Sequence, residues 1–185
     1  MKQAYKLAQK AISLDDSNPN GYVVLSFIYL MKRQHDRAIA EAERAIALDP
    51  NGAEGRNRLG LALIYAGRPE EAIAPLEKAI RINPIAPARF FLNLGRAYRD
   101  AGHYEEAIGE FRKAIHRAPD SVFAHWELVA AYSLAGRDEE ARSEAEEVLR
   151  IAPKFSLAVL KKRLPYKNRA DTERIVEALR KAGLK

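Results

Sequence analysis

The chain has 185 residues, enough for one domain with a sizeable core, and its 48% hydrophobic and 30% charged residues describe a folded chain rather than a disordered one. It contains no cysteine, which excludes disulfide bonds and thiolate metal sites. The longest apolar run, residues 23–31, is too short to span a bilayer, and the first residues lack the apolar core of a signal peptide. We therefore expect a cytoplasmic protein that does not enter a membrane.

The net charge of +6 is concentrated at the C-terminus. Residues 154–185 carry ten Lys and Arg against three Asp and Glu, a net charge of +7, so residues 1–153 have a net charge of −1. A basic tail can contact the phosphates of a nucleic acid, or it can be the solvated face of a terminal helix. We favour the second interpretation and keep nucleic-acid contact as a remote alternative.

In chain order, the first expected element is a helix over residues 1–14. Its Ala8 stands 34 residues before Ala42, and this register makes it the second half of a repeating unit whose first half is missing. We expect Tyr5, Ala8 and Ile12 to turn partly toward an upstream helix. This favours a fragment of a longer protein that self-associates through the truncated N-terminal helix, with a solitary capping helix as the alternative.

A repeated phrase occupies the middle of the chain. The sequences AGRPEEA, AGHYEEA and AGRDEEA begin at residues 66, 101 and 135, and prolines recur at intervals of 34, 35 and 34 residues, at Pro50, Pro84, Pro119 and Pro153. A fixed period of this size is typical of stacked supersecondary units.

Each unit is predicted to contain two helices. In the third full unit the first helix places Leu94, Tyr98 and Ala101 on one face, and Gly102 suits the left-handed position that closes it. The second helix begins with glutamates, which suit the positive helix N-terminus, and Pro119 ends it. Neither helix can bury its apolar stripe alone, so each unit needs a neighbour.

Three positions depart from the regular pattern. Arg33 replaces the loop glycine of the first full unit, at a cost of about 1 kcal/mol if the residue is left-handed. Pro75 falls inside a predicted helix, which it should kink unless it faces outward, and Pro87 marks a one-residue insertion between units.

The tail is predicted to end the array. A helix begins near residue 155 and should break early at Pro165. A final helix follows, with Asp171 as its N-cap and Gly183 at C′. A terminal repeat needs a polar outer face, and this helix has its apolar residues in a single stripe, Ile175, Leu179 and Ala182.

The repeat resembles the tetratricopeptide repeat family. The third full unit carries the family's pattern most completely, at Phe91, Leu94, Gly95, Tyr98, Gly102, Tyr104, Ala107, Phe111, Ala114 and Pro119. The resemblance implies an all-α, right-handed superhelical solenoid of antiparallel helix pairs with a C-terminal capping helix. Its units would be a truncated half repeat at 1–18, full repeats at 19–52, 53–87, 88–121 and 122–155, and a degenerate repeat or cap at 156–185.

The phrase RLPYKNRADTERIVEALRKAGL also resembles the tail that follows such repeats in some bacterial proteins with a class III adenylate/guanylate cyclase domain. This weaker resemblance implies a parent protein in bacterial signalling. An alternative function is therefore a regulatory module of a larger signalling enzyme such as a nucleotide cyclase.

No constellation of residues indicates an enzyme. The four histidines are scattered without metal-ligand spacing, and the paired glutamates recur at helix starts, where they serve the helix dipole. There is no phosphate-binding loop and no nucleophile elbow. We expect no catalytic residue, no cofactor and no metal.

The resemblance implies instead a protein-interaction scaffold, because this family holds a peptide or a partner domain in a concave groove lined by the first helices. The matching positions here are Phe27, Asn57, Arg58, Leu61, Tyr65, Arg89, Asn93, Arg96, Arg99 and Trp126. Arg96 and Arg99 would favour an acidic segment of a protein partner; alternatively, these arginines are merely solvated. A clamp for a C-terminal carboxylate is disfavoured, because only Asn93 fits and Glu127 would repel a carboxylate.

Overall fold

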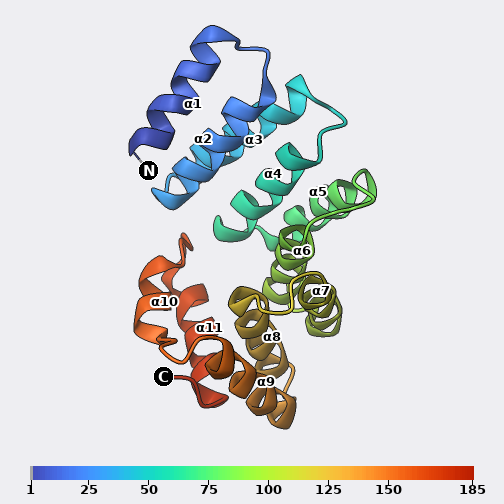
Figure 1. The fold of residues 1–185 in the computed structure, drawn as a ribbon, viewed down its shortest axis with the longest axis vertical. Coiled ribbons are helices and arrows are strands. Elements are labelled where there is room, and N and C mark those ends of the chain that lie inside the picture. The colour runs from blue at the N-terminus through green and yellow to red at the C-terminus, as the bar shows by residue number, and fades with distance from the viewer. Residues whose placement is uncertain (1) are drawn as a thin grey trace.

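The computed structural model describes residues 2–185, which form eleven α-helices and no strand (Figure 1). The expected all-α array of helix pairs with a C-terminal capping helix is confirmed. The helices are α1 (Lys2–Leu14), α2 (Pro19–Met31), α3 (His35–Leu48), α4 (Ala53–Tyr65), α5 (Pro69–Arg81), α6 (Ala88–Asp100), α7 (Tyr104–Arg117), α8 (Val122–Leu134), α9 (Asp138–Ile151), α10 (Leu157–Arg163) and α11 (Arg169–Lys181).

The loops inside the helix pairs close as the sequence predicts. Gly67, Gly102 and Gly136 all have positive φ, a conformation that glycine adopts without steric cost. Arg33 occupies the equivalent loop of the first pair with φ 58°, so it is the one non-glycine residue among 2–185 in a left-handed conformation. The chain tolerates about 1 kcal/mol of local strain there.

Prolines mark helix starts and one helix interior. Pro19 and Pro69 occupy the first turns of α2 and α5, where the missing N–H costs nothing. Pro87 is the N-cap residue of α6, at the insertion between two units. Pro75 lies half-buried inside α5, which continues through it to Arg81.

Stacking of the pairs buries the apolar stripes. The helices of each pair pack on each other, and the inner helices α2, α4, α6 and α8 also pack successively on one another. Close approach within a pair depends on glycine: a Cβ at Gly95 would lie 2.6 Å from the ring atom Cε1 of buried Phe111, and one at Gly60 would overlap Leu76. Each unit must present the same packing face to the next one, which explains why the sequence phrase repeats.

The first helix, α1, packs the face that carries Tyr5, Ala8 and Ile12 against α2. Ala8 is buried, the Tyr5 hydroxyl lies 3.4 Å from the Tyr29 hydroxyl, and Ile12 packs against Gly21. Ala8 therefore faces α2, whereas Tyr5 and Ile12 contact α2 but stay half-buried, so the expectation that they turn partly toward an upstream helix stays a prediction. The large apolar side chains of α1 that are exposed are Leu7 and Leu14, on other faces of the helix.

The tail forms the expected cap with one difference at its last helix. Helix α10 ends before Pro165, and the stripe of Ile175, Leu179 and Ala182 is buried. The N-cap is Asn168 rather than Asp171, because the Asn168 side chain accepts the Ala170 N–H at 3.0 Å and starts the helix earlier. Asp171 lies in the first turn, where its charge still suits the helix dipole.

The curvature of the array places the cap on its inside. The helix pairs follow a curved path from α1 to α9, and the chain then turns back so that α10 and α11 lie within the curve (Figure 1). Helix α11 packs against α8. We call the side formed by α2, α4, α6 and α8 the inner face.

The glycine contacts generate a paired prediction. Gly95→Ala should destabilise the protein by about 1–3 kcal/mol, because the new methyl group must displace a buried ring. Gly109→Ala, in α7, meets no atom within 4 Å and should stabilise the protein by about 0.5–1 kcal/mol through helix propensity. Urea denaturation of both variants measures the two shifts. Equal effects of the two substitutions would contradict the close packing of α6 on α7.

Candidate functional site on the inner face

An extended segment of the protein's own tail lies on the inner face. We call residues 164–168, between α10 and α11, the strap. Leu164, Pro165 and Tyr166 are all buried although they belong to no helix. The array therefore already binds one stretch of extended polypeptide.

The strap's backbone is held by the first and second helix pairs. The Arg33 guanidinium donates to the carbonyls of Leu164 and Tyr166, both at 2.8 Å. The Nε2–H of buried His35 donates to the Pro165 carbonyl at 2.7 Å. The Lys167 N–H donates to the Tyr65 carbonyl, at the end of α4, at 2.8 Å. Three consecutive strap carbonyls are thus satisfied by side chains from the loop before α3 and the first residue of α3, about 130 residues earlier in the chain.

These contacts explain why arginine stands where the other loops have glycine. A glycine at position 33 would relieve about 1 kcal/mol of strain but would remove both guanidinium bonds. Hydrogen bonds from a charged donor are worth about 1.5–3 kcal/mol each. The two hydrogen bonds therefore outweigh the backbone strain, and arginine at position 33 stabilises the protein as long as the strap is in place.

The Tyr166 side chain anchors the strap between α4 and α6. Its hydroxyl donates to Asp100 Oδ2 at 2.6 Å and accepts from Arg99 Nη2 at 2.9 Å. Its ring meets the Tyr65 ring edge to face, with centroids 4.7 Å apart. Burial, reinforced by the Asp100 carboxylate, raises the Tyr166 pKa well above its ordinary value, so the hydroxyl stays protonated and can donate.

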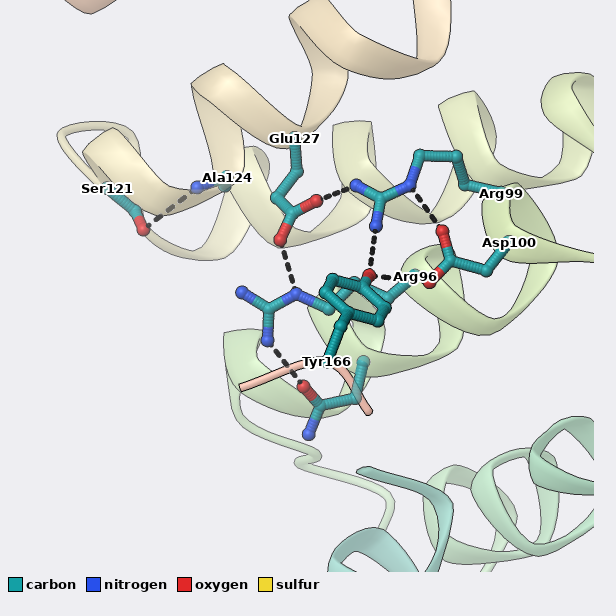
Figure 2. Close-up of polar contacts among 8 residues, drawn as sticks. Arg96, Arg99, Asp100, Ser121, Ala124, Glu127 and Tyr166 are labelled. Carbon is teal, nitrogen blue, oxygen red and sulfur yellow. Dashed lines mark hydrogen bonds and ion pairs between the residues drawn. The ribbon is translucent and has the colours of Figure 1, made fainter. Parts of the chain in front are cut away.

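Behind Tyr166 lies a buried ionic cluster, which Figure 2 shows. The Glu127 carboxylate accepts from Arg96 Nε with one oxygen and from Arg99 Nη1 with the other. Arg99 Nε also donates to Asp100 Oδ1 at 2.9 Å. Arg99 and Glu127 are both fully buried, so their charges compensate each other inside the protein.

The electrostatics of the cluster keep both arginines charged. Burial alone lowers the pKa of Arg96, but Glu127 and the tyrosines outweigh it and leave that pKa above its ordinary value. For Arg99, burial is likewise outweighed by Asp100 and Glu127, and its pKa lies well above the ordinary value. These two guanidinium groups are therefore permanent cations whose counter-ions belong to the protein itself.

A polar chain extends from this cluster toward α4. Arg96 Nη1 donates to Asn93 Oδ1 at 3.0 Å, and Asn93 Nδ2 donates to Asn57 Oδ1 at 2.9 Å. Asn57 and Asn93 are buried, and Asn57 Nδ2 has no hydrogen-bond partner within residues 2–185. Four of the residues predicted to line a groove thus form one buried hydrogen-bonded chain: Asn57, Asn93, Arg96 and Arg99.

An apolar cavity of about 500 Å³ lies between the inner face and the cap. It brings together Phe27, Leu61, Tyr65, Arg96 and Trp126, half of the ten predicted groove residues, from α2, α4, α6 and α8. The tail supplies the opposite wall through Phe155, Val159, Leu160, Leu164 and Pro165. The size and apolar lining suit one or two large side chains of a ligand.

The two remaining predicted residues lie beside this cavity or outside it. The Arg58 guanidinium stacks over the Phe27 ring, 4.8 Å from its centroid. Arg89 is exposed and pairs with Glu54, so it takes no part in the cavity lining.

The sequence interpretation missed the strap residues Tyr166 and Lys167 and their holders Arg33 and His35. One signal was available: Arg33 alone breaks the glycine pattern of the loops, and a strained non-glycine residue needs compensation elsewhere. Glu127 gave a second signal, because a carboxylate on an inner helix next to two arginine positions favours an internal ion pair.

Other classes of site receive no support from residues 2–185. Within this range no three His, Asp or Glu side chains are grouped so that they could hold a metal ion. None of the helices described is both long and apolar enough to cross a membrane.

The strap contacts generate a second prediction. Arg33→Gly should destabilise the protein by about 2–5 kcal/mol in urea denaturation, although glycine suits the backbone there better, because two strap carbonyls lose their donor. The matched control is Gly102→Arg, which places arginine at the equivalent left-handed position of another loop, where a Cβ atom meets no other atom within 4 Å. The Gly102→Arg substitution should lower the free energy of unfolding by about 1 kcal/mol. A stabilising effect of Arg33→Gly would show that the strap contacts contribute nothing.

Comparisons with known proteins agree with this architecture. The tetratricopeptide repeat family profile matches residues 28–87 and 92–154, and the curated protein sequences contain no significant match. Similar solved structures include YrrB, a TPR protein with an unusual peptide-binding site (TM-score 0.64, 20% identity, 95% of this chain and 90% of that one covered). They also include the type IV pilus biogenesis factor PilW, with a TM-score of 0.77 and 22% identity over 98% of this chain and 82% of that one. A further one is the thermophilic TPR protein TTC0263 of Thermus thermophilus, with a TM-score of 0.72 and 23% identity over 95% of this chain and 88% of that one. At these identities the structures show the fold alone, whereas the profile covers most of the sequence: the chain belongs to the tetratricopeptide repeat family.

Proposed function

We propose that the protein is an interaction module that binds an extended segment of a partner protein at the cavity between its inner face and its cap. The observation that carries this proposal is the strap. Its main-chain carbonyls and its amide are bound by the array in the way that a peptide ligand would be. The apolar cavity next to the strap offers an anchor pocket on the same face.

Accessible aromatic side chains support binding at this place. Phe27 and Phe123 line the cavity and are 40% and 56% exposed, and exposed apolar side chains that gather at one place commonly mark an interaction site. Trp126 and Tyr65 line the same cavity and are buried. Rigid aromatic pockets bind anchor residues at little conformational cost.

The alternatives formed from the sequence have less support. Several basic side chains of the tail pair with carboxylates: Lys161 with Glu173, and Lys181 with Asp138. This pairing favours a solvated terminal helix over a nucleic-acid surface. A regulatory role in a larger signalling enzyme, and self-association through α1, stay predictions.

Selection from a random peptide library displayed on phage tests the proposal. We expect saturable binders to the immobilised protein, and we expect Phe27→Ala combined with Phe123→Ala to weaken their binding at least about tenfold, because both rings line the anchor pocket. The control is Ile85→Ala, which is 82% exposed and lies outside the cavity. Failure to select any binder, or binders indifferent to the double variant, would contradict the proposal.

A further inference from the structure

The lining of the cavity has an unbalanced charge. It contains Lys154, Arg163 and Arg96 and no Asp or Glu. Arg96 is neutralised by Glu127, as described above. Lys154 and Arg163 are exposed, and neither belongs to any ion pair within residues 2–185. Two uncompensated cations therefore stand at the edge of an apolar pocket.

A third cation, Arg58, lies beside the array side of the cavity. Arg58 lies one helical turn before Leu61, a lining residue, and stacks on Phe27, another lining residue. It has no ion-pair partner within 4 Å among the described residues, and its buried Nε has no hydrogen-bond acceptor there. A guanidinium that is partly desolvated and lacks a full set of acceptors can gain from a ligand carboxylate.

We propose that the partner segment bound here is acidic and carries one bulky apolar side chain flanked by Asp or Glu. This inference rests on the proposed function and specifies the chemistry of the partner. The apolar side chain enters the pocket above Trp126, and the flanking carboxylates face Lys154, Arg163 and Arg58. The two groups expected from the sequence to attract an acidic segment, Arg96 and Arg99, instead have internal counter-ions, so the attraction comes from a different set of cations.

Nuclear magnetic resonance titration of the full chain with three synthetic peptides tests this inference. The peptides are Gly-Glu-Glu-Trp-Glu-Glu-Gly, its counterpart with Lys in place of Glu, and its counterpart with Ala in place of Trp. We expect the acidic Trp peptide to shift the amide resonances of Phe123 and Val159, and to bind at least about tenfold tighter than either counterpart. Its affinity should fall as salt is added.

Charge-reversal variants distinguish the contribution of the cavity cations to peptide binding from that of the protein's net charge. Lys154→Glu combined with Arg163→Glu should weaken the binding of the acidic Trp peptide on the order of tenfold, because two attractive charges at the cavity become repulsive. The matched control is Lys10→Glu with Arg142→Glu, two exposed cations on α1 and α9 that are outside the cavity and change the net charge equally. The control should weaken binding less than about twofold.

Two results overturn the inference. One is equal binding of the acidic and basic Trp peptides, and the other is equal weakening by the cavity variant and its control. Either result would leave the proposed function standing if library-selected peptides of other composition still shift Phe123 and Val159. Absence of any cavity binder, selected or synthetic, would overturn the proposed function itself.

Discussion

The shared carboxylate of Glu127 is the interaction on which the inner face depends. Two arginines one turn apart on α6 are buried beside it, and burying an unpaired guanidinium costs several kcal/mol. Glu127 of α8 offsets that cost for both, and Asp100 and Tyr166 each accept a hydrogen bond from one of the other two nitrogens of the Arg99 guanidinium. Removing one member of such a cluster typically costs about 3–5 kcal/mol, because the others are left uncompensated. The cluster therefore fixes α6, α8 and the strap relative to one another.

The fixed position of α6, α8 and the strap decides which part of the inner face remains open to a partner. The polar middle of the face is used internally, by the ionic cluster and by the strap that covers it. What remains is the apolar pocket between Phe27 and Val159, whose wall is half array and half cap. A partner would consequently meet a surface made jointly by the repeats and the tail, so the shape of the pocket depends on the tail staying docked.

The repeat architecture could be predicted from the sequence because its causes are local. The left-handed glycines, the acidic helix starts and the apolar stripe of α11 each depend on residues a few positions apart. Half of the predicted groove residues do meet in one cavity, because equivalent positions of stacked units face the same side.

The internal use of Arg96 and Arg99 could not be predicted in the same way. Their partners come from α8 and from a strap whose path depends on the curvature of the whole array, and no local pattern encodes that curvature. The contact between Arg33 and the strap spans more than 130 residues of sequence. The displaced N-cap has a simpler cause: Asn168 and Asp171 are both suitable capping residues, and the point where the strap leaves the inner face selects Asn168.

The docking of the strap is the central claim, and amide hydrogen exchange at Lys167 tests it most directly. This N–H lies outside any helix, and its hydrogen bond is to the Tyr65 carbonyl at 2.8 Å. If the strap is docked, the Lys167 amide exchanges slowly, at a rate comparable to the amides of α11, and Arg33→Gly accelerates it. Exchange of the Lys167 amide in the native protein at the rate of an unstructured peptide would contradict the account.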